Sequence, residues 1–198
     1  ATMRGQLVPV DERTFNPSAR SMAYTKEVWR RAGGWPEWVR FSEDTLFDLK
    51  MRKMGVNWKY APTAIVHWRP RCTFNALARQ FYHYGTGRGH TQIGATDFRY
   101  NLRNLGLLGG ATVAARFAPT AWLVVAALSI YFYVWTFHAK ACRIAKTLNA
   151  TNAYPLCLGV IWTVLFSNLL GYVVGSVQRI LNARRYVLPI RSYMATQS

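Results

Sequence analysis

FAPTAWLVVAALSIYFYVWTF, residues 117 to 137, is a stretch of 21 residues without a charged side chain. YPLCLGVIWTVLFSNLLGYVVGSV, residues 154 to 177, repeats this feature over 24 residues. About 20 residues of helix cross the hydrocarbon core of a bilayer, whereas buried helices of soluble proteins seldom lack charge for so long. The two stretches therefore predict a two-helix transmembrane hairpin over residues 117–178.

Basic residues flank both apolar stretches. The chain has 25 Lys and Arg against 8 Asp and Glu, which gives a formal net charge of +17. Cytoplasmic flanks of membrane helices are enriched in Lys and Arg. We therefore expect a multi-pass protein of the cell (inner) membrane, with a polar part (residues 1–92) and a basic tail (residues 179–198) in the cytoplasm. Lys140, Arg143 and Lys146 fall between the two stretches, which leaves open a hairpin that does not fully cross.

The sequence does not favour nucleic-acid binding, and its cysteines do not favour a disulfide or a zinc site. A nucleic-acid binder carries its basic residues on a folded polar domain, whereas much of the charge here lies beside the apolar stretches. No nucleic-acid partner is therefore predicted. Cys72, Cys142 and Cys157 have neither an even count nor metal-ligand spacing, so they predict neither a disulfide nor a zinc site.

The polar part contains signals for short helices and short strands. Thr25 and Thr73 are placed to cap helices, and a further helix is expected over residues 45–54. Alternation of apolar and polar residues predicts a strand over 56–60, and a second short strand is expected over 64–68.

Three glycines lie near the C-terminal end of the polar part. The helix after Thr73 is predicted to end in a mobile loop at Gly85, Gly87 and Gly89, because glycine is a poor helix former. The next segment, residues 93–116, is basic and amphipathic, and we expect it to lie in the plane of the membrane interface.

Adjacent carboxylates are the clearest candidates for chemistry. Glu43 and Asp44 cannot flank one bond as the two carboxyl groups of a glycoside hydrolase do, roughly 5 to 9 Å apart. A single carboxylate held ionised at the start of a helix suits a general base that takes a proton from a hydroxyl nucleophile. The same pair can instead serve only to charge a helix N-terminus. The residues alone leave both interpretations open.

Four motifs occur together in one order: NPSARSMAY (16–24), SEDTLFD (42–48), HWRPR (67–71) and RQFYHYGTGRG (79–89). This order resembles the second half of the catalytic domain of family 2 glycosyltransferases, which have the GT-A fold. The resemblance covers residues 17–89. It implies an α/β fold class, with the C-terminal half of a GT-A (Rossmann-like) domain, the acceptor and catalytic-base half, over residues 1–92.

The activity implied by the resemblance is sugar transfer. The chain would be a membrane-anchored glycosyltransferase that moves a sugar, with inversion, from a nucleotide-sugar donor to a lipid-linked or cell-envelope glycan acceptor. Asp44 is implied to be the catalytic base, and Glu43 to orient its loop or touch the acceptor. His67 is implied to complete a site for Mg²⁺ or Mn²⁺ that neutralises the diphosphate leaving group; a simple packing role for this histidine stays open.

The resemblance also implies binding residues. Gln80 and Tyr84 would contact the acceptor, and Ser21 would line the acceptor cleft. His83 and Tyr84 stand where the Q-x-x-R-W motif of membrane-bound relatives has Arg and Trp. The implied diphosphate contacts are Arg69, Arg71, His83 and Arg88. For each arginine, a solvated role or contact with a lipid phosphate stays open.

The first half of such a domain is missing from the sequence. No D-x-D motif occurs, although relatives carry one at the end of their nucleotide-binding unit. We therefore expect a partner polypeptide that carries the missing N-terminal half. The alternative is a non-catalytic membrane scaffold that retains a glycosyltransferase remnant and binds no sugar nucleotide.

Overall fold

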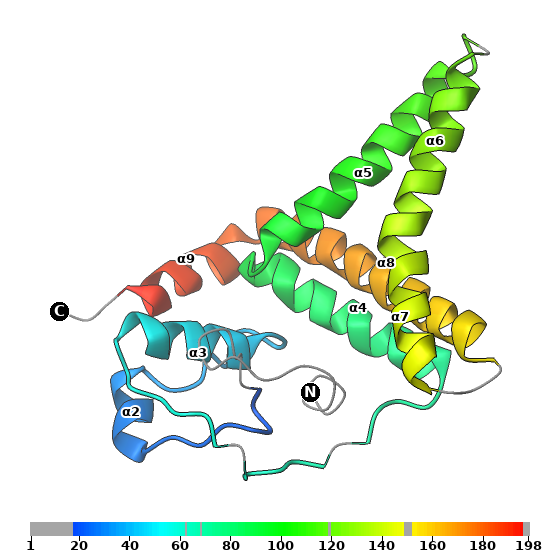
Figure 1. Cartoon of the computed structure of the whole chain (residues 1–198). Coiled ribbons are helices and arrows are strands. Elements are labelled where there is room, and N and C mark those ends of the chain that lie inside the picture. The colour runs from blue at the N-terminus through cyan, green and yellow to red at the C-terminus, as the bar shows by residue number, and fades with distance from the viewer. Residues whose placement is uncertain (1–17, 62, 68, 119, 149–151, 196–198) are drawn as a thin grey trace.

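The computed structural model describes residues 18–61, 63–67, 69–118, 120–148 and 152–195. Helices dominate these ranges (Figure 1). In chain order they are α2 (Lys26–Arg31), α3 (Glu43–Lys53), α4 (Phe74–Thr91), α5 (Ala95–Ala114), α6 (Ala121–Tyr133), the π-helical segment η1 (Val134–His138), α7 (Ala139–Leu148), α8 (Ala153–Leu181) and α9 (Ala183–Met194).

The described parts of the chain contain no β-strand. A GT-A domain is built on a Rossmann-like parallel sheet, so the predicted α/β fold class and the resemblance to GT-A glycosyltransferases are both wrong. Residues 56–61 and 64–67, where strands were expected, are irregular and mostly exposed, with 71% of Ile65 accessible. Residues 56–60 alternate in hydropathy as a strand does, but no described segment forms a ladder with either stretch, and a strand is stable only with partners.

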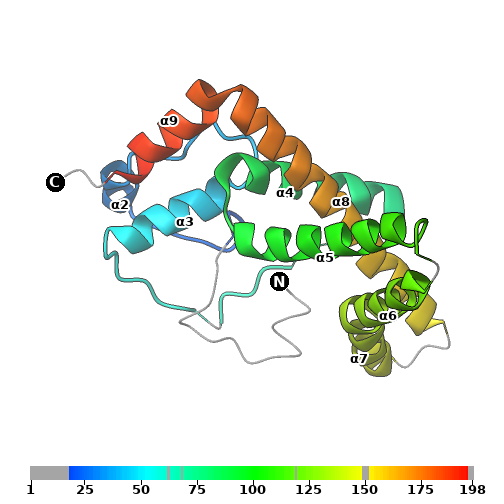
Figure 2. The same cartoon turned by 90° about the horizontal axis from the view of Figure 1, so that it is seen from above.

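The main contact of the fold joins α4 to α8, which lie side by side in both views (Figures 1 and 2). The two helices run in the same direction. The Phe74 ring, at the start of α4, lies 3.3 Å or less from the position of a Cβ on Gly159. Near the end of α4, His90 Nε2 lies 2.8 Å from Gln178 Oε1. The polar helix α4 is therefore attached along most of the length of an apolar helix.

Glycines let these two helices approach to backbone contact. Gly85 and Gly89 on α4 are four residues apart, as are Gly171 and Gly175 on α8. A Cβ added to Gly89 would lie 2.5 Å from the carbonyl oxygen of Tyr172, and a Cβ at each of the other three positions would clash with the backbone of the opposite helix. This four-residue spacing of small residues is typical of helix pairs in membranes.

The predicted loop at Gly85, Gly87 and Gly89 is consequently wrong, since α4 continues through all three to Thr91. Each glycine in a helix interior costs about 1 kcal/mol relative to alanine. Close packing against neighbouring backbone offsets that cost here.

Two helical stretches are long and apolar enough to cross a membrane. They are residues 121–148, formed by α6, η1 and α7 without a break, and α8. Only 6% and 22% of the most apolar 18 residues of the two stretches are buried in the fold, so most of these apolar residues are left exposed. Lys140, Arg143 and Lys146 lie on α7 rather than in a connecting loop.

The helix before the first apolar stretch rises away from the α4–α8 pair. α5 covers most of the segment predicted to be amphipathic, and it meets α6 at an apex (Figure 1). Phe117, near this apex, is 87% exposed. The α5–α6 hairpin thus presents apolar side chains away from the polar part.

A small aromatic core organises the polar part. The Phe47 side chain is fully buried, stacks on Trp35 at 4.9 Å between ring centroids, and contacts Tyr24 at 5.0 Å. The predicted cap at Thr25 is confirmed, because its hydroxyl accepts a hydrogen bond from the Val28 amide at 3.2 Å. These contacts fix the segment before α2 against α3.

The C-terminal helix α9 returns to this polar part. Lys50 Nζ donates to the Ala195 carbonyl oxygen at 2.7 Å, and the Tyr193 hydroxyl donates to the Gly34 carbonyl oxygen at 2.9 Å. The Trp38 ring packs edge-on against Tyr193 at 6.3 Å. The segment that contains α2 and α3 is therefore held between α4 on one side and α9 on the other.

Candidate functional site

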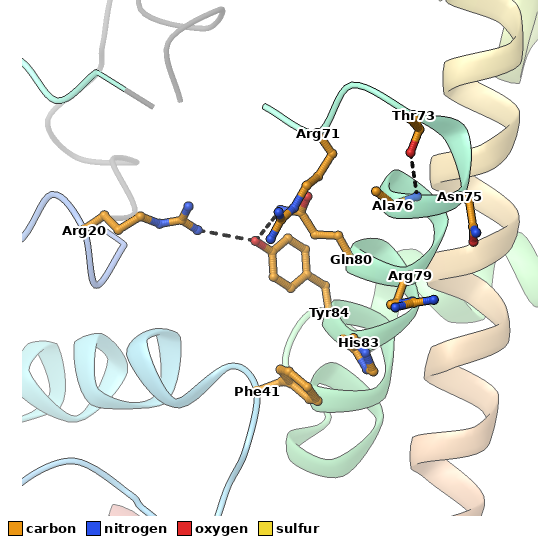
Figure 3. Close-up of a pocket in the computed structure, with 10 residues that line it drawn as sticks. All are labelled: Arg20, Phe41, Arg71, Thr73, Asn75, Ala76, Arg79, Gln80, His83 and Tyr84. Atoms are coloured by element: carbon orange, nitrogen blue, oxygen red, sulfur yellow. Dashed lines mark hydrogen bonds between the residues drawn. The ribbon is translucent and has the colours of Figure 1, made fainter. Parts of the chain in front are cut away.

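A polar cavity of about 550 Å³ lies between the first three turns of α4 and the segments that precede α2 and α3 (Figure 3). Its lining residues are Arg20, Phe41, Arg71, Thr73, Asn75, Ala76, Arg79, Gln80, His83 and Tyr84. We call this cavity the arginine pocket. Three of these residues are arginines and none is acidic, so the arginine pocket is electropositive.

The helix α4 supplies most of the lining because its first turn is well fixed. The Thr73 hydroxyl accepts a hydrogen bond from the Ala76 amide at 3.2 Å, which confirms the predicted cap. Residues three and four apart on a helix share a face. Arg79, His83 and the pair Gln80 and Tyr84 therefore line the same side of α4.

A hydrogen-bond relay joins α4 to the segment before α2. Gln80 Nε2 donates to the Tyr84 hydroxyl oxygen at 2.8 Å, and Arg20 donates to the same oxygen at 3.4 Å (Figure 3). A phenol that accepts two hydrogen bonds still has its own proton to donate. Tyr84 thus holds Arg20 at the mouth of the pocket and remains a donor for a ligand.

Part of the lining of the arginine pocket is an aromatic contact between Phe41 and His83. The Phe41 ring stacks on the His83 imidazole, with 4.6 Å between centroids and 17° between planes. One turn further along α4, a Cβ on Gly87 would lie 2.5 Å from the Phe41 carbonyl oxygen. Gly87 therefore allows the segment before α3 to lie directly on α4, which brings the two walls together.

The acidic pair lies in the first turn of α3, beside the arginine pocket but not in its lining. Asp44 Oδ2 accepts a hydrogen bond from the Ala19 amide at 3.2 Å, and Oδ1 accepts one from the Thr45 amide at 2.8 Å. Asp44 thereby holds the residue that precedes Arg20. Burial raises the pKa of Glu43, a backbone hydrogen bond acts against this rise, and the charge of Asp44 adds to it.

Of the site residues predicted from the sequence, the structure brings four into the arginine pocket: Arg71, Gln80, His83 and Tyr84. Ser21 lies next to Arg20, and its hydroxyl oxygen accepts a hydrogen bond from the Ser18 amide at 3.3 Å. Arg88 lies outside the pocket, with its guanidinium 5.9 Å from the centroid of the Phe98 ring on α5.

His67 and Arg69 are exposed, on the irregular segment before α4, and do not line the pocket. No group of three His, Cys, Asp or Glu side chains in the described ranges is placed to hold a metal ion. His67 thus has no pair of further His, Cys, Asp or Glu side chains beside it in these ranges with which to hold Mg²⁺ or Mn²⁺. The metal and its ligand remain predictions.

Sequence reasoning missed Arg20, Arg79 and Phe41. Arg20 lies within the quoted SARS motif, and Arg79 directly precedes Gln80 and is four residues from His83. The helical spacing could have identified Arg79. The contribution of Arg20 and Phe41 depends on contacts between segments far apart in the sequence, as shown by the 64-residue separation of Arg20 and Tyr84.

No family model, curated protein or solved structure matches this chain.

The arginine pocket is chemically suited to an anion. Guanidinium groups pair with phosphate through two parallel hydrogen bonds, and His83 and the Tyr84 hydroxyl add donors of a second kind. A phosphate group would find no carboxylate to repel it among the described residues of the lining.

Proposed function

We propose that this chain is a membrane-associated protein that binds a phosphate-bearing ligand in the arginine pocket. The observation that carries the proposal is the presence of three arginines, Arg20, Arg71 and Arg79, and of no acidic residue, among the described residues that line one cavity. Membrane association is supported by the two helical stretches that are long and apolar enough to cross a bilayer.

The size of the cavity favours more than a single phosphate. Ligand pockets commonly enclose about 300 to 1,000 Å³, and the arginine pocket, at about 550 Å³, falls within this range. A diphosphate offers several acceptor oxygens to the three guanidinium groups and leaves space for part of its carrier. The diphosphate role predicted for Arg71 and His83 is consistent with this proposal.

Catalysis would need a base beside the bound ligand. Asp44 is the nearest candidate by sequence, but both of its carboxylate oxygens already accept backbone hydrogen bonds. We therefore assign Asp44 the role of a positioning residue for Arg20. Binding rather than sugar transfer is the function that these contacts support.

The test uses the full chain in lipid nanodiscs and calorimetric titration with inorganic diphosphate. Charge-assisted hydrogen bonds are worth roughly 1.5 to 3 kcal/mol, so Arg79→Ala and Arg20→Ala should each weaken binding about tenfold or more. Arg31→Ala is the matched control, because Arg31 is an exposed arginine on α2 that does not line the pocket. Equal affinity in all three variants and the native chain would contradict the proposed site.

Two further titrations identify the source of the phosphate. A nucleoside diphosphate that binds much more tightly than inorganic diphosphate would indicate a soluble nucleotide ligand. A phosphate ester with a hydrocarbon chain that binds more tightly would indicate a lipid.

A further inference from the structure

We infer that the phosphate-bearing ligand is a lipid whose hydrocarbon chain lies in an apolar groove between the start of α4 and the first half of α8. The inference rests on the proposed anion-binding function of the arginine pocket, and it adds the chemical class of the ligand.

The groove is a second cavity, of about 510 Å³. It is lined by Phe74, Pro155, Leu158, Gly159, Trp162 and Thr163. None of these side chains is charged. The hydroxyl of Thr163 donates to the Gly159 carbonyl oxygen at 2.8 Å, so this polar group is already satisfied within its own helix. The groove therefore suits a hydrocarbon chain and offers little to a polar ligand.

The first turn of α4 contributes residues to both the groove and the arginine pocket. Thr73 and Asn75 line the arginine pocket, while Phe74, between them in sequence, lines the groove. This turn lies beside the start of α8 (Figure 3). Only the N-terminal turn of one helix separates the cationic site from the apolar one, which matches a molecule with a charged head and an apolar chain.

The location of the groove supports a lipid as its occupant. Its α8 residues belong to a helix whose most apolar 18 residues have a mean hydropathy of 1.9, which is apolar enough to cross a membrane. Phe74 and Trp162 are 49% and 47% exposed. Large aromatic side chains left half exposed beside a membrane helix are the surface that a lipid chain would cover.

The experiment measures how affinity depends on chain length. Methyl, butyl and octyl phosphate are titrated into the full chain in nanodiscs. Each methylene buried in an apolar site is worth about 0.8 kcal/mol, or about fourfold in affinity. Octyl phosphate should therefore bind at least tenfold more tightly than methyl phosphate. Leu158→Ala should reduce this gain and leave the affinity for methyl phosphate unchanged.

Partition of octyl phosphate into the bilayer is measured by a control variant. Leu170→Ala removes the same side chain from a position on α8 that is 59% exposed and outside the groove. Native affinities in Leu170→Ala, with a loss in Leu158→Ala, support the inference. If octyl phosphate gains the same affinity over methyl phosphate in both variants and in the native protein, the inference is overturned, because the octyl group would then lie in the bilayer and not in the groove.

The remaining outcomes separate this inference from the function on which it rests. If methyl and octyl phosphate bind equally well, the lipid is excluded and the arginine pocket stands. If neither binds, the proposed function itself fails.

A photoreactive octyl phosphate provides a measurement on the unmodified chain. Crosslinks on peptides that contain Phe74 or residues 155–163 are expected. Crosslinks confined to other membrane-facing peptides would overturn the inference.

Discussion

His90 is a buried histidine surrounded by cationic groups. Its ring N–H donates to Gln178 Oε1 at 2.8 Å, its imidazole stacks on Tyr186 at 4.0 Å, and Arg179 donates to its carbonyl oxygen at 2.7 Å. Burial lowers the pKa of His90, the hydrogen bond with Gln178 acts against this, and the charges of Arg185 and Arg179 lower it further. The folded chain therefore favours neutral imidazole.

This shift predicts a loss of stability in acid. A folded-state pKa below the unfolded value of about 6.5 means that the unfolded chain binds more protons. Stability should be complete above about pH 6.5 and fall as the pH drops below that value. Thermal unfolding in detergent at pH 7.5 and pH 5.5 should show a decrease of about 2 to 5 °C in Tm. His90→Phe keeps the aromatic contact and should reduce this decrease; an unchanged pH dependence would assign it to other groups.

Asp44 tests whether a carboxylate can act on the arginine pocket through its neighbour. Asp44→Ala removes the acceptor for the Ala19 amide, so Arg20 should be held less firmly. We expect diphosphate affinity to fall about threefold to tenfold, the effect of about one hydrogen bond. Asp44→Asn retains one oxygen and should restore part of the affinity.

The control for Asp44 is Asp97→Ala, which removes an acid from the first turn of α5. It makes the same change in net charge at a distance from the pocket, and affinity should not fall. If Asp97→Ala weakens binding as much as Asp44→Ala, the effect is one of general charge and not of position.

At the level of helices, the sequence was informative where the determining contacts are local. The caps at Thr25 and Thr73 are hydrogen bonds within three residues, and both helices begin where those residues predict. The end of α4 was predicted wrongly, because Gly85 and Gly89 pack on α8, more than 80 residues later, and Gly87 packs on Phe41. Gln80 and Tyr84 were named as site residues through the resemblance, and their spacing of four residues on one helix brings them into hydrogen-bond contact. Arg20 was not identified, because only tertiary packing brings it to them.

The α4–α8 contact predicts opposite effects for two glycine substitutions. A Cβ at Gly85 would clash with the Asn168 carbonyl group, whereas a Cβ at Gly106 on α5 would meet nothing within 4 Å. Gly85→Ala should lower the free energy of unfolding by about 1 to 3 kcal/mol through overpacking. Gly106→Ala should be neutral or stabilising by up to about 1 kcal/mol, since alanine favours helix. Denaturant or thermal unfolding in detergent measures both, and equal effects would contradict the close crossing.

For the whole molecule, the native cysteines report on membrane topology. Cys72 is exposed in the polar part, while Cys142 is partly exposed on α7 and Cys157 is buried. If residues 121–148 and α8 cross the bilayer, a membrane-impermeant maleimide should label Cys72 and Cys142 from the same face of oriented vesicles, because Phe74 packs on Gly159 and His138 shares a hydrogen bond with Tyr154, both near the start of α8. Labelling of the two cysteines from opposite faces would contradict the parallel packing of α4 on α8. Cys157 should react only after unfolding.

The return of α9 to the polar part affects how the chain is made. Lys50 contacts a residue 145 positions later, and Tyr193 contacts one 159 positions earlier. When the ribosome has synthesised α3, it has not yet synthesised the two apolar stretches or α9. Tyr193 and Ala195, the partners of Gly34 and Lys50, are therefore made last. The polar part must therefore wait, with Lys50 and the Gly34 carbonyl without their final partners, until the membrane segments have left the ribosome. The contacts of α9 with Lys50 and with the Gly34 carbonyl oxygen are thus among the last of the fold to form.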